Sequence, residues 1–331
     1  MVQTVAEAQF AAALRAAEDP AASPEERAEM LMEIAMSLQV KPKSSDQLRD
    51  AVTLYRRALT EAPAPAALLQ ARIRARMGTA LQAIPDGGTE ALRQACECHE
   101  AALPLLREHG RPEEAAEAEL NLGLVTQSLA GLGSARIQDA IQCYHRALRV
   151  FKRESHPQEF AIVHNNLAIA YLSIPATDER GKMREALAVQ SFEEVLKVVN
   201  LIDHPSEYAM IQNNLGNALQ YAASGHVMEN NLRALSAYDE ALKVRSARDT
   251  PVEYANTIAN KANVLRSLPP VIDAKQGRDA LAEALALYRE AKLLFEQNAL
   301  HDRAELIAAV IAEVEAEIEH GGVHGGGKVL H

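Results

Sequence analysis

Apolar and small residues recur at helical spacing along most of the chain, most clearly between residues 205 and 241. In the first half of this stretch Tyr208, Ile211, Leu215, Ala218 and Leu219 recur at helical spacing, with the small Gly216 on the same side. Such spacing predicts an amphipathic helix that begins at Pro205. After a polar break, Ala234, Tyr238 and Ala241 follow at intervals of four and three residues, which predicts a second helix packed against the first.

The same pair of helices is repeated along the chain. The small residue of the first helix recurs every 43 to 48 residues, at Ala35, Gly78, Gly123, Ala168, Gly216 and Ala262. The bulky residue of the second helix recurs with it, at Tyr55, His99, Tyr144, Phe192, Tyr238 and Tyr288. Small residues let two helices approach closely, so one ring fills the remaining volume of each pair. These positions are therefore predicted to be the packing residues of the repeat.

The repeat extends over nearly the whole chain and predicts an all-α array with about fourteen helices and no β-sheet. Six full repeats are expected, at about 24–62, 65–110, 112–155, 157–203, 205–249 and 251–298. An unpaired second helix is expected at 2–18, and an unpaired first helix at 301–319. Residues 1–319 then form a single solenoid, and the Gly/His-rich tail at 320–331 is expected to be disordered.

The motif Asn214-Leu215-Gly216, with Ala234, Tyr238 and Ala241 downstream, resembles the tetratricopeptide repeat. Repeats of that family are about 34 residues long, whereas these have 43 to 48. The openings at Pro157 and Pro205 are similar to those of long arrays in bacterial regulatory proteins. The resemblance implies a right-handed solenoid whose first helices line a concave groove, and it is specific for the fold rather than for a function.

Composition and charge restrict the classes of partner. The formal net charge is −11, which disfavours binding to a nucleic-acid backbone. No apolar run approaches the length of a membrane span, and the N-terminal residues lack the basic start of a signal peptide. Cys96, Cys98 and Cys143 are odd in number, which fits a reducing cytosol. We therefore expect a cytoplasmic protein with no nucleic-acid or membrane partner.

The candidate site is a set of amide and basic side chains in the C-terminal half. By the resemblance, a partner-binding groove would include Asn165, Asn213, Asn217, Gln220, Asn256, Asn263 and Arg266. Asparagine is a poor helix former, and its amide can pair with the main chain of any bound peptide. The alternative is packing, because Asn121, Asn166, Asn214 and Asn260 occupy the same position of successive first helices.

Other chemistries find little support in the sequence. The family's clamp for acidic C-terminal tails needs a lysine, but the corresponding positions hold Met32, Ala75, Leu120, Asn165, Asn213 and Ala259. Cys96 and Cys98 point to different sides of a helix, so they do not form a metal pair. No nucleophile, base and orienting group can be placed together. We expect no catalytic residues, no metal and no cofactor.

These observations favour a non-catalytic scaffold or adaptor that binds a neutral or basic segment of a partner protein in its groove. Two alternatives stay open. One is a self-assembling protein, a dimer or filament, in which the apolar face of the last helix is covered (Leu306, Val310, Ile311 and Val314). The other is a regulatory or sensor array that acts with a separate effector enzyme.

Overall fold

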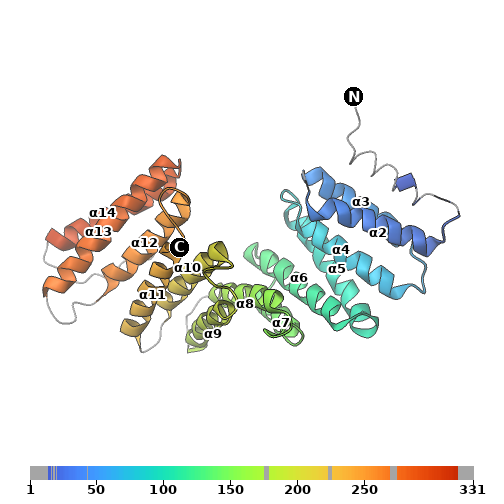
Figure 1. Cartoon of the computed structure of the whole chain (residues 1–331), viewed down its shortest axis with the longest axis horizontal. Helices are drawn as coiled ribbons and strands as arrows, with labels where there is room; N and C mark the ends of the chain where they lie inside the picture. Colours follow the sequence, from blue (N-terminus) through green and yellow to red (C-terminus); the bar gives the residue numbers. More distant parts are fainter. Residues whose placement is uncertain are drawn as a thin grey trace, which may run out of the picture. The chain divides into compact units, whose positions relative to one another are not determined.

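The protein is described by a computed structural model, in which the described residues are 14, 15, 17, 19, 21–42, 44–174, 179–222, 226–268 and 274–319. Within these residues there are thirteen helices and no strand, drawn in Figure 1. Most of the predicted first helix at 2–18 and the predicted tail at 320–331 lie outside the described residues.

The helices have these bounds: α2 Pro24–Val40, α3 Ser45–Glu61, α4 Ala67–Gln82, α5 Gly88–His109, α6 Pro112–Gly131, α7 Ile137–Ala147, α8 Pro157–Leu172, α9 Glu179–Leu196, α10 Pro205–Tyr221, α11 Val227–Leu242, α12 Pro251–Ser267, α13 Ala274–Gln297 and α14 His301–Glu319. Each of the six predicted repeats holds two of them, and the predicted terminal helix at 301–319 is α14. The prediction of an all-α array of helix pairs is confirmed.

Local sequence explains where the first helix of a repeat begins. At α2, the Ser23 hydroxyl accepts a hydrogen bond from the Glu26 amide (3.2 Å), and the Glu26 carboxylate accepts one from the Ser23 amide (2.7 Å). This reciprocal pair satisfies two amides that the helix leaves unbonded. Proline occupies the first helical position of five first helices (Pro24, Pro112, Pro157, Pro205 and Pro251), where its missing N–H costs nothing.

The chain divides into two compact units, residues 1–166 and 167–331. In unit 1, α2 packs on α3, α4 on α5 and α6 on α7, and each pair also packs on the next. In unit 2, α10 packs on α11 and α12 on α13, while α9 contacts α10 and α14 contacts α13. The prediction of one continuous solenoid over residues 1–319, and of its handedness, stays a prediction.

Within a repeat, a ring of the second helix lies directly on the small residue of the first. A methyl group built on Gly216 would stand 2.5 Å from Cε1 of Tyr238, and one built on Gly123 would stand 2.5 Å from Cε1 of Tyr144. The same side-chain types are fully buried at the repeats that carry alanine instead (Ala35, Ala168 and Ala262 with Tyr55, Phe192 and Tyr288). Close approach of the helices therefore requires glycine only where the ring lies tightest.

The hydroxyl of each buried tyrosine returns to the first helix of its own repeat, where a side-chain amide oxygen accepts its hydrogen bond. Tyr55 donates to Gln39 (2.8 Å), and Tyr144 donates to Gln127 (2.7 Å). Tyr238 and Tyr288 make the equivalent bonds in unit 2. A buried hydroxyl without such a partner would cost ~1–3 kcal/mol, so these amides are part of the packing of the repeat.

His99 stands where the other repeats have Tyr or Phe, and it lacks this bond. The ring is fully buried against Gly78, and neither of its nitrogens has a hydrogen-bond partner. Burial disfavours the imidazolium form and lowers the pKa of His99 to about 4. The second repeat therefore carries a neutral, unsatisfied imidazole in its core.

The last helix, α14, buries one side only. Ala304, Ile307, Val310 and Val314 are buried against α13, whereas Ala312, which corresponds to the small residue of the other first helices, is exposed. Val310 and Val314 are thus core residues of unit 2 rather than parts of a free apolar face. The exposed face of α14 carries Leu306 instead.

Candidate functional site

Three of the amides expected to line a groove bond to the buried tyrosines of unit 2. The Tyr238 hydroxyl donates to Asn217 Oδ1 (2.7 Å) and lies 3.2 Å from Gln220 Oε1. The Tyr288 hydroxyl donates to Asn263 Oδ1 (2.6 Å). The oxygens of these side chains therefore satisfy the core of their own repeats, a contact that the sequence did not reveal.

The remaining members of the set also have contacts within the fold, with one exception. Arg266 of α12 pairs with Glu313 (2.9 Å) and Glu317 (2.5 Å) of α14. Two further contacts join neighbouring first helices: Arg303 Nη1 donates to Asn256 Oδ1 (3.1 Å), and Asn260 Nδ2 lies 3.5 Å from Asn213 Oδ1. Asn165 Oδ1 is buried without a hydrogen-bond partner. The structure thus connects most of these residues in separate contacts inside the fold rather than in one open row.

A groove is present on the first helices of unit 1. A cavity of about 250 Å³ lies across α2, α4 and α6. Its lining combines methionine, arginine, glutamate and small residues: Met32, Glu33 and Met36 of α2, Arg72, Ala75, Arg76 and Thr79 of α4, and Glu114, Glu117, Ala118 and Asn121 of α6, with Leu106 of α5 beneath. Three successive repeats therefore contribute side chains to one surface, which we call the α2–α4–α6 groove.

Ion pairs hold the α6 side of this groove against α4. Arg72 Nε lies 2.7 Å from Glu114 Oε1, and Arg76 Nη1 lies 3.2 Å from Glu117 Oε1. The hydrogen bond from Arg72 lowers the pKa of the Glu114 carboxyl. Arg72 and Arg76, the two arginines of α4 that line the groove, are thus each paired with a glutamate of the next repeat.

The α2 side of the groove is acidic, and Arg72, which is paired with Glu114, also lies near enough to interact electrostatically with Glu29. Glu25, Glu29 and Glu33 are exposed and stand four residues apart on one face of α2. No ion pair within the described residues joins any of the three. They continue into a second hollow of about 600 Å³, lined by α2, the start of α4 and His109. Like charges at this spacing destabilise a helix by ~0.2–0.5 kcal/mol per pair, so a cation placed here would relieve the repulsion.

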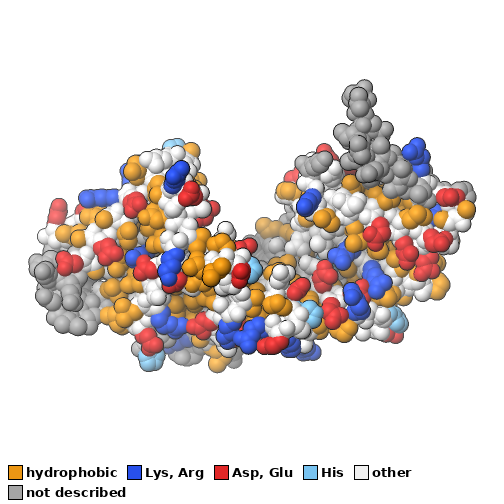
Figure 2. Space-filling model, viewed as in Figure 1, with side chains coloured by type: hydrophobic (Ala, Val, Ile, Leu, Met, Phe, Trp, Pro, Cys, Tyr) orange, Lys and Arg blue, Asp and Glu red, His pale blue; other side chains and the backbone are white. Residues whose placement is uncertain are grey.

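The residues that line the two hollows carry a net negative charge. It contains five glutamates (Glu25, Glu29, Glu33, Glu114 and Glu117) and two arginines (Arg72 and Arg76), a difference of three negative charges when His109 is neutral. Side chains of both signs and apolar side chains lie interspersed on the face of unit 1 that Figure 2 shows. Met32 and Met36 are half-buried and supply a flexible apolar floor.

The sequence analysis did not find this groove, although two signals point to it. The first signal is that the acids of α2 recur every four residues. The second is that Arg72 and Arg76 precede their glutamate partners by 42 and 41 residues, which is the repeat length shortened by about one helical turn. Asparagine drew attention because it is unusual inside a helix. Charged residues on an exposed helical face are common, so these acids and arginines did not stand out in the sequence. Only the structure shows which of them form ion pairs.

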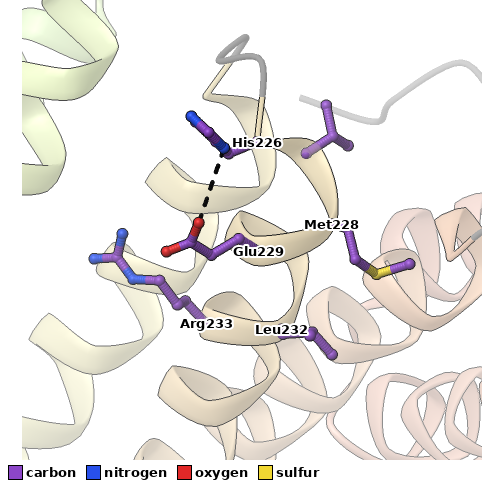
Figure 3. A pocket seen from close by; sticks show the side chains of 6 residues that line it. His226, Met228, Glu229, Leu232 and Arg233 are labelled. Atoms are coloured by element: carbon purple, nitrogen blue, oxygen red, sulfur yellow. Dashed lines mark ion pairs between the residues drawn. The ribbon is translucent and has the colours of Figure 1, made fainter.

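Two other hollows are weaker candidates. One, of about 500 Å³, is lined only by residues 226–229, Leu232 and Arg233 of the start of α11. His226, Glu229 and Arg233 lie on one side of this helix and Met228 and Leu232 on another, with 4.0 Å between His226 Nδ1 and Glu229 Oε2 (Figure 3). The second lies between α5, α6 and α7 beside Cys96 and Cys143. The α11 hollow has no second wall, and we assign no ligand to either.

The reactive side chains of the described residues can be compared with the requirements of a metal site and of a nucleophilic thiol. No cluster of three or more His, Cys, Asp or Glu side chains that could hold a metal ion is found among them. Burial raises the pKa of Cys96 and Cys98 to about 11, which keeps both thiols protonated and poorly nucleophilic. No helix in the described part of the chain is long and apolar enough to cross a membrane.

Comparison with known proteins shows the fold. No family model matches the sequence, and no curated protein matches it. The solved structure of BtubC (BKLC) from P. vanneervenii is 23% identical and superimposes with a TM-score of 0.51 over 74% of this chain and 92% of that one. A signal transduction ATPase with numerous domains and a tetratricopeptide repeat sensor, PH0952 from Pyrococcus horikoshii, is 14% identical with a TM-score of 0.57. That match covers 92% of this chain and 42% of the ATPase. The chain therefore has the all-helical repeat fold that these proteins share.

Proposed function

We propose that the protein is a non-catalytic scaffold that binds a segment of a partner protein on the first helices of its repeats. The observation that carries this proposal is the α2–α4–α6 groove, to which three successive repeats contribute. A surface built by three repeats suits an extended or helical segment better than a small metabolite, because it is long, shallow and open to solvent. The similarity of fold to a protein described as carrying a repeat sensor agrees with this class of function.

The amide set of unit 2 is a less direct choice for the binding surface. Asn217, Gln220 and Asn263 accept hydrogen bonds from buried tyrosines, so alanine at these positions would leave a core hydroxyl without its acceptor. A loss of binding in such variants would be confounded by a loss of stability. We keep the first helices of unit 2 as a second candidate surface.

The proposal is tested by placing a photo-crosslinking amino acid at one of two half-buried or exposed positions of unit 1. Thr79 lines the groove, whereas Thr53 is exposed on the second helix α3. After irradiation in a native extract, a protein crosslinked through residue 79 and absent from the residue-53 sample supports the groove. Equal crosslinking from both positions, or crosslinking from residue 53 alone, would refute it.

A second candidate function is self-assembly, and the exposed face of α14 favours it. The side chain of Leu306 is 47% exposed, and Ala312 is exposed, whereas Ala35, Ala168 and Ala262 at the equivalent positions are fully buried. A second helix from another copy would complete this half-repeat. Sedimentation velocity over a hundredfold range of concentration tests this candidate: a mass that rises with concentration and returns to the monomer in Leu306→Glu supports it, and a constant monomer mass rules it out.

A further inference from the structure

We infer that the segment bound in the α2–α4–α6 groove is basic and amphipathic, with Lys or Arg side chains facing α2 and one apolar side chain on the methionines. This inference rests on the function proposed above and specifies its partner. It commits to a segment of another protein.

The charge arrangement of the groove carries the first half of the inference. Arg72 and Arg76, the arginines of α4 that line the groove, are already paired with Glu114 and Glu117, so they offer little attraction to an acidic ligand. Glu25, Glu29 and Glu33 have no ion pair within the described residues and stand in line along α2. Glutamates four positions apart in a helix are ~6 Å apart along its axis. Two or three cations at a similar interval along the bound segment would meet them.

The apolar part of the groove carries the second half. Met32 and Met36 of α2 line the cavity of about 250 Å³ together with Arg72 and Arg76, and the small side chains of Ala75 and Ala118 line it too. Thioether side chains adapt to ligands of different shape. A cavity of this size accepts one or two aliphatic or thioether side chains. A highly charged segment with no apolar residue would leave it unfilled.

Two positions that the tail clamp of the resembled family would need to be basic line this groove, and they hold Met32 and Ala75. Acidic tails therefore meet neither a free lysine nor a free arginine here. The electrostatic field of the whole chain also favours a cationic partner, because the chain carries a net charge of −11. A negative field attracts cationic segments at low ionic strength.

The test is a selection of random twelve-residue peptides displayed on phage against the full chain, followed by fluorescence anisotropy with the synthetic peptides recovered. We expect enriched peptides to carry at least two Lys or Arg and one aliphatic or Met residue, and their affinity to fall as salt is raised. The variant Glu25→Gln/Glu29→Gln/Glu33→Gln should bind them roughly tenfold more weakly, which corresponds to three exposed ion pairs of ~0.2–1 kcal/mol each.

Two further variants separate the possible outcomes. Asp279→Asn/Glu283→Gln/Glu290→Gln removes three exposed acids of α13 and should leave the affinity unchanged. Thr79→Trp fills the cavity and should abolish binding, with circular dichroism and melting as controls for folding. Acidic or neutral peptides that lose binding to Thr79→Trp would overturn the basic-segment inference and leave the scaffold function standing. Peptides that bind Thr79→Trp as well as the wild type, or a selection that enriches nothing, would overturn both.

Discussion

Replacing His99 by phenylalanine should change how the stability of the protein depends on pH. In the folded chain the ring is fully buried, its nitrogens are unpaired, and burial lowers its pKa from 6.5 to about 4. The unfolded chain therefore takes up a proton below pH 6.5 that the folded chain refuses until about pH 4. The stability contributed by the neutral ring is fully present above pH 6.5 and is lost as the pH falls toward 4.

The size of this effect follows from the two pKa values. Each pH unit between them corresponds to about 1.4 kcal/mol, so the wild type should lose about 3 kcal/mol of unfolding free energy between pH 6.5 and pH 4 through this one residue. The variant His99→Phe lacks the titrating group and should keep that stability. It should also be more stable than the wild type at pH 7 by ~1–3 kcal/mol, because two unsatisfied nitrogens leave the core. Rings of this size already fit against glycine at Gly123 and Gly216.

The assay is urea denaturation of both proteins, followed by circular dichroism at pH 7.0, 6.0, 5.0 and 4.5. Hydrogen exchange of the peptides from α4 and α5 locates the change, because repeat proteins can unfold in parts. Gly131→Ala, at a site where nothing lies within 4 Å, changes no titrating group and supplies a control whose pH dependence should match the wild type. Parallel pH profiles for the wild type and His99→Phe would refute the assignment of a buried neutral imidazole.

Three further changes test the packing of the repeats. Gly216→Ala should destabilise unit 2 by ~1–3 kcal/mol in urea denaturation, since the new methyl group would overlap the Tyr238 ring. The control Gly131→Ala, where nothing lies within 4 Å, should be neutral or stabilising. Equal changes of stability in the two variants would contradict the close packing of Gly216 on Tyr238. Glu119→Gln, which weakens the pairs of a buried carboxylate with Arg107 and Arg146, should cost ~1–3 kcal/mol, and an unchanged urea midpoint would count against it. Arg266→Ala should raise hydrogen exchange in α14 by removing its pairs with Glu313 and Glu317, whereas unaltered exchange would show that α13 alone holds α14.

Much of the fold could be predicted from the sequence because the packing of a repeat is local. A small residue and a ring recur at nearly constant spacing, and each pair meets within one helical hairpin. Periodicity and turn signals therefore predict an all-α array of helix pairs, which the described residues confirm. The division into two compact units could not be predicted, because the repeat spacing is uniform through residue 166.

The candidate site was harder to predict because it depends on side-chain pairing between different helices. The sequence shows that Asn217 and Asn263 are unusual in a helix, but not that the hydroxyls of Tyr238 and Tyr288 reach them. It likewise shows acids on α2 without showing that they are left unpaired beside a methionine floor. Side-chain contacts across 20 to 50 residues decide both features, and no local pattern encodes them.

The most direct test of the proposed groove is hydrogen exchange of the full chain, with and without a peptide recovered from the selection or a crosslinked partner segment. If the segment binds in the α2–α4–α6 groove, added protection should be concentrated in the first helices α2, α4 and α6 of unit 1. Exchange in α3 and α5 should change little. Protection confined to α10 and α12 of unit 2, or spread over the second helices, would contradict the assignment of the α2–α4–α6 groove as the binding surface.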